Sequence, residues 1–231
     1  MIKIIGFDLD NTLWPVKPAI LGAEKALAAH LRSLHPDIQY PHPQSAVLRD
    51  ELIAQDPSLS FRLTALRREV LSVVIREIPA LRETANELAD EAMIIFLRSR
   101  SLVTPYAAAE TTLAELSQTY ALCALTNGNA DLSRIAIGQY FDFVRSAEEE
   151  GAPKPEPALF RYALSRAGCE PHEMVYVGDD PDLDIRAAAA IGLKTVWFQS
   201  PDGRPVSPPP PYDEIVHHLE ELPDAIARLN R

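Results

Sequence analysis

This 231-residue sequence has little of what marks several common protein classes. Its two cysteines form no Cys-x-x-Cys pair and are too few for a disulfide framework. Cys123 lies in an apolar run, so we expect it to be a small buried side chain. Lysine and arginine number 22 against 33 acidic residues. A net charge of -11 with no basic patch argues against a nucleic-acid or anionic-membrane partner.

The sequence also lacks the signals that direct proteins to membranes. No apolar stretch is long enough to span a bilayer, and no basic leader with a cleavage site precedes the first apolar run. The six histidines show no metal-ligand spacing. We therefore expect a cytoplasmic protein with no membrane partner, and the sequence leaves its state open between monomer and homodimer.

Short apolar runs rich in β-branched residues recur along the chain, and each is nearly continuous rather than alternating. This pattern is typical of strands buried on both faces of a parallel sheet. The runs are Lys3 to Phe7, Ala121 to Leu125, Met174 to Val177 and Lys194 to Phe198, with shorter candidates at Phe143 to Arg145 and Ile215 to Leu219. The helical stretches between them predict an α/β fold with a doubly wound, Rossmann-like parallel sheet.

Helices are expected between the later strands. Pro105 after Thr104 is typical of a helix start and predicts a helix to about Gln118. Glycines predict the ends of two further helices, which are Glu156 to Ala167 before Gly168 and Asp182 to Ile191 before Gly192. A proline-rich connection is expected over Gln199 to Tyr212, and a last helix from Pro223.

The stretch from about Pro15 to Leu102 has helical periodicity and no convincing strand. Its predicted helical segments are Ile20 to Leu34, Gln44 to Ala54, Leu59 to Ile78 and Ala80 to Arg98. We therefore predict an all-helical domain at residues 16–102, inserted into an α/β core made of residues 1–15 and 103–231. An insertion at this point would cover the turn that precedes it like a lid.

Asp8 and Asp10 end the first apolar run, and Asn11 and Thr12 follow them. In an extended backbone the i, i+2 spacing points both carboxylates to the same side. Two neighbouring anions repel, so the chain needs a cation or a shared proton there. The apolar flanks argue against two solvated acids. One carboxylate as nucleophile, one as proton shuttle and a divalent ion between them would explain the pattern.

Polar clusters follow four of the predicted strands. Open parallel sheets place ligands at the carboxyl edge of the strands, so we expect these clusters to meet there. They are Asp8, Asp10 and Thr12; Thr126-Asn127-Gly128-Asn129; Lys154-Pro155; and Gly178-Asp179-Asp180-Pro181-Asp182-Leu183-Asp184.

These clusters resemble the four motifs of the haloacid dehalogenase-like hydrolase superfamily, in its branch of phosphatases with a helical cap. Phe-Asp-Leu-Asp-Asn-Thr-Leu is similar to the first motif and Leu-Thr-Asn-Gly-Asn to the second. Lys154 before Pro155 resembles the third motif, and Val-Gly-Asp-Asp-x-x-x-Asp the fourth. The resemblance covers essentially the whole chain in the right order, and the inserted helices match the family's cap. It implies a Mg²⁺-dependent phosphoric monoester hydrolase with a small-molecule phosphate ester as substrate.

The resemblance implies a role for each matching residue. Asp8 would attack phosphorus and form an aspartyl-phosphate, and Asp10 would protonate the leaving oxygen and then take a proton from water. Thr126 would hydrogen-bond a phosphoryl oxygen, and Lys154 would offset charge on Asp8 and the phosphoryl group. At the phosphate, the resemblance also implies Thr12, Asn127 and Gly128. At Mg²⁺ it implies Asp8, Asp10 and Asp179 as ligands. It implies that Asp180 and Asp184 orient those ligands or serve as alternative ligands.

Several of these residues have a simpler interpretation. Asp179 or Asp180 can cap the helix that starts near Pro181. Thr12 and Thr126 can be turn hydroxyls, and Asn127-Gly128 can build a tight turn. Trp14 either lines the pocket or packs beneath the inserted helices, and we favour packing. One arginine of the inserted helices could reach a substrate anion, although most surface arginines are solvated. The candidates are Arg67, Arg68, Arg98 and Arg100.

The sequence leaves alternatives to the phosphatase. A haloacid dehalogenase attacks carbon and, by the resemblance, lacks the second acid of the first motif, so Asp10 argues against it. A phosphosugar mutase shares both acids and stays possible on sequence. A non-catalytic regulatory protein on the same fold is disfavoured because every catalytic position is filled. Asn11 resembles nucleotidase and acylneuraminate-phosphatase branches, which hints at a nucleotide or sugar phosphate.

Overall fold

The computed structural model describes residues 1–200 and 208–230, so much of the expected proline-rich connection lies outside the described residues. The chain divides into two compact units. The sheet unit contains Met1–Val16, Thr104–Gly128 and the residues from Leu132 onward. The helical unit contains Lys17–Val103 and Asn129–Asp131.

The sheet unit is built on six parallel strands, which confirms the predicted fold class. Their bounds are β1 (Ile4–Phe7), β2 (Ala121–Thr126), β3 (Phe143–Ser146), β4 (Met174–Gly178), β5 (Lys194–Phe198) and β6 (Glu214–Val216). The order across the sheet is β3-β2-β1-β4-β5-β6, so β1 is central and the order reverses beside it. Ile5 of β1 lies between Leu122 and Val175, and all three are fully buried. Continuous apolar strands therefore form the middle of the sheet, as expected.

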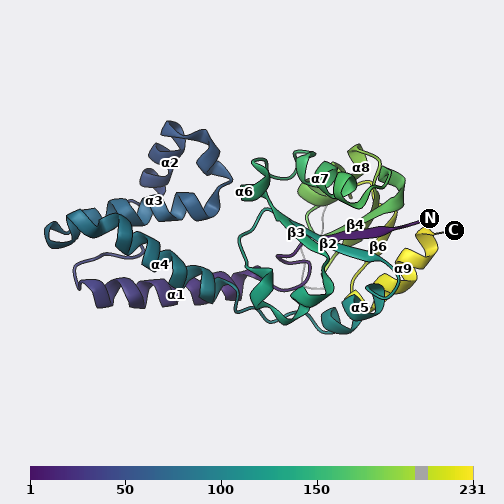
Figure 1. Ribbon diagram of the computed structural model, residues 1–231, viewed down its shortest axis with the longest axis horizontal. Helices are drawn as coiled ribbons and strands as arrows, with labels where there is room; N and C mark the ends of the chain where they lie inside the picture. Colours follow the sequence, from purple (N-terminus) through teal and green to yellow (C-terminus); the bar gives the residue numbers. More distant parts are fainter. Residues whose placement is uncertain (201–207, 231) are drawn as a thin grey trace. The chain divides into compact units, whose positions relative to one another are not determined.

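Helices cover both faces of this sheet (Figure 1). One face carries α5 (Ala109–Leu116) and α9 (Leu222–Leu229), and the other carries α7 (Ala158–Ala167) and α8 (Ala187–Ala190). The short α6 (Ala147–Glu150) follows β3. Beneath α7 and α8 the core includes Ile4, Leu125, Phe160, Tyr176 and Ala188. Cys123 is buried in the same cluster, as predicted.

Two helix predictions need correction. The helix expected from Pro105 begins at Ala109, because Tyr106 N–H bonds Leu13 O and Ala108 before the helix is left-handed with φ 61°. The helix expected from Asp182 to Ile191 begins with a π-helical turn, Pro181–Arg186, before α8. The predicted stops are present, with φ 60° at Gly168 and φ 86° at Gly192.

The helical unit contains α1 (Val16–Leu34), α2 (Ser45–Gln55), α3 (Leu63–Arg76) and α4 (Ala85–Arg100), and none of its described residues forms a strand. Its core joins α1, α3 and α4 through buried residues such as Leu27, Leu71 and Phe96. No helix in the described part of the chain is both long and apolar enough to cross a membrane.

A cavity of about 480 Å³ lies within the helical unit. Arg67, one of the four candidate arginines, lines it together with Glu24, Tyr40 and Phe96. The Arg67 guanidinium lies 2.7 Å from Glu24 Oε1 and 3.9 Å from the centre of the Phe96 ring. The Tyr40 hydroxyl donates to the other oxygen of Glu24. On this wall of the cavity the Arg67 guanidinium is therefore held by a carboxylate and an aromatic ring.

Candidate active site

The ends of β1, β2 and β4 meet at a cavity of about 170 Å³ in the sheet unit. The structure brings nine of the ten predicted site residues to its lining. They are Asp8, Asp10, Thr126, Asn127, Gly128, Lys154, Asp179, Asp180 and Asp184, and only Thr12 is outside the lining. Parallel strands carry these residues because their carboxyl ends share one edge.

Asp8 is the first residue after β1, and its N–H donates to Val177 O of β4. The side chain is almost fully buried. Its Oδ1 accepts a 2.7 Å hydrogen bond from Lys154 Nζ. The same ammonium donates to Asp184 Oδ1 at 2.6 Å. One buried lysine therefore holds two carboxylates that lie far apart in the chain.

Asn127 fixes the backbone of Lys154 from the loop after β2. Its Oδ1 accepts from Lys154 N–H at 2.8 Å, and its Nδ2 donates to Lys154 O at 2.9 Å. The Asn127 side chain thus binds the backbone of the lysine segment, and the place of Asn127 at the phosphate stays a prediction.

Asp184 reaches the site from the π-helical turn after β4. Its Oδ1 accepts from Lys154, and its Oδ2 accepts from Asp180 N–H at 3.0 Å. Gly178 makes the approach possible, since a Cβ there would lie 2.4 Å from the Asp184 carboxyl carbon. A glycine at position 178, just before Asp179 and Asp180, is therefore a steric requirement of the site.

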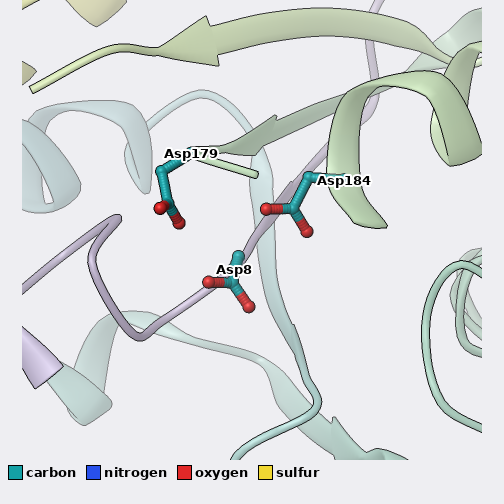
Figure 2. A group of neighbouring side chains, drawn as sticks. All are labelled: Asp8, Asp179 and Asp184. Carbon is teal, nitrogen blue, oxygen red and sulfur yellow. The ribbon is translucent and has the colours of Figure 1, made fainter. Parts of the chain in front are cut away.

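Asp8, Asp179 and Asp184 have carboxylate oxygens within 4.8 Å of one another. Figure 2 shows the three side chains converging from the end of β1, the loop after β4 and the following turn. Thr12, fully buried behind them, donates from its hydroxyl to Asp179 Oδ1 at 3.1 Å. The Thr12 side chain therefore supports an acid of the cluster.

The Asp180 side chain caps the turn that follows. Its Oδ1 accepts from the N–H groups of Asp182 and Leu183, at 2.9 and 2.8 Å. The simpler reading of Asp180 as a cap is thus what the structure shows. Asp182 has a side chain that is 73% exposed and pairs with Arg186.

The electrostatics of the cluster are unbalanced. Burial raises the pKa of Asp8 above the usual range of a carboxyl group, and Asp184 and Asp179 add to this while Lys154 opposes it. Burial and the Asp184 charge raise the pKa of Asp179 to about 7. Burial alone would lower the pKa of Lys154, but Asp184 and Asp8 hold it well above its ordinary value. If all three carboxylates were ionised beside one ammonium, the cluster would carry excess negative charge, and the raised pKa values show that it would take up protons unless a cation offsets this charge.

Asp10 lies beside the cluster, at the start of a turn. Its Oδ1 accepts a 2.8 Å hydrogen bond from Trp14 Nε1. Asn11 follows Asp10 and has a left-handed backbone conformation, with φ 64°. Its N–H donates to Trp14 O. Trp14 is fully buried, as the packing interpretation predicted, and it also orients Asp10.

Thr126 ends β2 and is buried. Its Oγ1 accepts from Gly128 N–H at 2.9 Å, which closes the tight turn that the sequence suggested. Sequence reasoning missed Tyr176, whose hydroxyl lies 2.9 Å from Lys154 Nζ. The sequence did contain a clue to this residue, because Tyr176 is the single phenol in an otherwise apolar strand. A buried hydroxyl needs a hydrogen-bond partner.

The haloacid dehalogenase-like hydrolase family model matches residues 2–192. The chain belongs to this family. The predicted resemblance is therefore confirmed, and the chain is a hydrolase with the sheet and insertion described above.

Its curated relatives include phosphatases. The 5-amino-6-(5-phospho-D-ribitylamino)uracil phosphatase of Escherichia coli is 28% identical over 87% of this chain and 85% of its own length. The glyceraldehyde 3-phosphate phosphatase of Methanopyrus kandleri is 31% identical, with 85% and 83% covered. These relatives support a phosphatase.

A solved structure described as a 2-haloacid dehalogenase from Pseudomonas syringae aligns with a TM-score of 0.93. It is 38% identical, and 99% of each chain is covered. The solved structure and the curated relatives thus have names that imply attack on different atoms, carbon in the one and phosphorus in the others.

Proposed function

We propose that this protein is a Mg²⁺-dependent phosphatase that hydrolyses a small phosphorylated metabolite through an aspartyl-phosphate on Asp8. The observation that carries the proposal is the buried cluster in which Lys154 binds both Asp8 and Asp184 beside Asp179. Such a cluster holds a nucleophilic carboxylate in place and leaves uncompensated charge for a metal ion.

Asp8 is the proposed nucleophile. A carboxylate is a weak nucleophile in water, so it must be desolvated and aligned. Asp8 is 7% exposed, and its Oδ1 is fixed by Lys154. This arrangement leaves Oδ2 to attack phosphorus, and the Lys154 charge limits the repulsion between two anions.

Asp10 is the proposed acid and base. It would protonate the leaving alcohol oxygen as the P–O bond breaks, and would then take a proton from the water that hydrolyses the aspartyl-phosphate. The Trp14 indole donates to Asp10 Oδ1 and so orients the carboxyl group.

The residues at the cluster fit Mg²⁺, because it prefers oxygen ligands and three carboxylates here face one ammonium. The side chains of Asp8 and Asp179 and the backbone carbonyl of Asp10 would hold the ion. Asp184 would orient the ligands, since Lys154 and Asp180 N–H already bind its two oxygens. When bound, Mg²⁺ would neutralise charge that develops on the phosphoryl oxygens.

Thr126, Gly128 and the backbone of Asn127 are the proposed phosphate-binding groups. The helical unit is the proposed cap, and we propose that it recognises the organic part of the substrate. Phosphatases related to this chain are named for substrates as different as glyceraldehyde 3-phosphate and an N-acylneuraminate phosphate. The physiological substrate is therefore to be found by a screen of phosphorylated metabolites scored by kcat/KM.

The test is phosphate release from p-nitrophenyl phosphate. We expect activity with Mg²⁺, loss of activity with EDTA and recovery when Mg²⁺ is restored. Asp8→Asn should remove turnover. Activity that survives chelation would contradict the metal assignment, and substantial turnover by Asp8→Asn would contradict the nucleophile.

A dehalogenase is the second candidate, because the solved structure with a TM-score of 0.93 carries that description. A halide leaves without taking up a proton, so Asp10 would have no leaving group to protonate in that reaction. Chloride release from 2-chloropropionate, measured beside phosphate release, separates the two. Chloride release without phosphatase activity would overturn the proposal.

A further inference from the structure

The Tyr176 hydroxyl lies in the interior of the sheet unit, in the middle of β4. The residue is fully buried. Its oxygen is 2.9 Å from Lys154 Nζ and 2.9 Å from Leu125 O of β2. An ammonium can only donate and a carbonyl can only accept. The hydroxyl therefore accepts from Lys154 and donates to Leu125, and both directions are fixed.

Tyr176 completes the donor set of Lys154. A lysine ammonium has three N–H groups. Here they point to Asp8 Oδ1 at 2.7 Å, Asp184 Oδ1 at 2.6 Å and the Tyr176 hydroxyl at 2.9 Å. With all three used, the ammonium has no free rotation. The phenol therefore sets the angle at which Lys154 meets Asp8.

The sheet provides a fitted space for the Tyr176 ring. Gly6 of β1 faces it, and a Cβ at Gly6 would lie 2.9 Å from Tyr176 Cδ2. Phe160 of α7 meets the ring edge to face, with centroids 4.9 Å apart. The hydroxyl is thus held by packing on the ring and by Leu125 O, independently of Lys154.

We infer that Tyr176 is a positioning residue that holds the Lys154 ammonium against Asp8 during phosphoryl transfer. The inference rests on the proposed phosphatase function. Tyr176 does not line the 170 Å³ cavity and so acts only through Lys154. Because Lys154 contacts Asp8 and Asp184, we expect the main effect on the alignment of the nucleophile.

Tyr176→Phe keeps the ring and removes the hydroxyl. We expect kcat to fall about tenfold, since a lost hydrogen bond leaves a Lys154 N–H unsatisfied. KM for p-nitrophenyl phosphate and the half-saturating Mg²⁺ concentration should stay within about twofold. Tyr162→Phe is the matched control, because Tyr162 is a half-buried tyrosine of the same unit whose ring packs on Phe143, away from Lys154.

A purely structural role predicts a different result for Tyr176→Phe. The melting temperature would fall, but kcat measured well below it would equal that of the wild type. Folded Tyr176→Phe with wild-type kcat overturns the inference. If the wild type hydrolyses no phosphate ester, that result contradicts the proposed function instead. A second measurement then decides the inference about Tyr176.

That second measurement uses the wild-type chain and needs no activity. Lys154 is the only buried residue among the five lysines. Nitrogen-15 NMR of lysine side chains should show one ammonium whose protons exchange slowly at neutral pH. In Tyr176→Phe that signal should shift or exchange faster. Absence of a slowly exchanging ammonium in the wild type overturns the inference, even if the variant fails to fold.

Discussion

The Trp14 indole Nε1 donates a 2.8 Å hydrogen bond to Asp10 Oδ1, four residues earlier in the chain. The backbone supports the same pairing, because Asn11 N–H donates to Trp14 O. A buried tryptophan thus fixes the orientation of the proposed acid and base. The Trp14 side chain therefore both packs in the interior and orients the proposed acid and base.

Trp14→Phe tests this relationship. The variant removes the indole donor while it keeps an aromatic ring in the buried position. We expect kcat to fall about tenfold with little change in KM, because Asp10 loses its orientation but the phosphate contacts remain. In an Asp10→Asn background the same substitution should add little, since its target is gone. Equal effects in both backgrounds would show that Trp14 acts through packing alone.

Mg²⁺ should raise the melting temperature of the wild type, because a dication relieves the repulsion among the three acids. Asp179→Asn removes one buried charge. It should raise the metal-free melting temperature by at least about 2–4 °C and abolish the rise on adding Mg²⁺. Asp182→Asn is the control, because that acid is 73% exposed and pairs with Arg186, and it should keep the Mg²⁺ effect. A full Mg²⁺ effect in Asp179→Asn would contradict the proposed ligand.

Gly178→Ala should remove most activity. The added Cβ would lie 2.4 Å from the Asp184 carboxyl carbon and must displace it from Lys154. Gly22→Ala in α1 is the matched control, since no atom lies within 4 Å of its added Cβ. That control should gain about 0.5–1 kcal/mol of stability and keep its activity. Wild-type kcat in Gly178→Ala would show that the position of Asp184 is not critical.

The helical unit should control specificity through its 480 Å³ cavity. Arg67→Met breaks the contacts with Glu24 and Tyr40 and removes the guanidinium over Phe96. We expect the ranking of phosphorylated metabolites by kcat/KM to change through KM. Arg82→Met changes an exposed arginine of the same unit and should leave the ranking intact. An unchanged ranking in Arg67→Met would remove the cavity from substrate recognition.

The sequence was most informative about the polar residues that lie at the ends of the strands. Asp8, Thr126 and Asp179 each directly follow or end a buried strand, and parallel pairing must bring such positions to one edge. The order of motifs therefore predicted which residues meet at one cavity. It could not predict the partners of individual side chains, which depend on register and on rotamers.

Three residues illustrate what was missed. Tyr176 sits in an apolar strand, and only the pairing of β1, β2 and β4 shows that its hydroxyl reaches Lys154. Asn127 makes a contact that the sequence did not reveal, because its side chain binds the Lys154 backbone across 27 residues of sequence. Pro105 satisfied the local rule for a helix start, but the bond from Tyr106 N–H to Leu13 O holds that segment out of the helix.

The most direct test of the account is a crystal structure of the protein with Mg²⁺ and beryllofluoride, which mimics a phosphoryl group on a carboxylate. We predict that the fluoride complex is bonded to Asp8, with Mg²⁺ between Asp8 and Asp179 and the ammonium of Lys154 still on Asp8. Beryllofluoride bound elsewhere, or a cavity that holds neither ligand while the acids point apart, would contradict it.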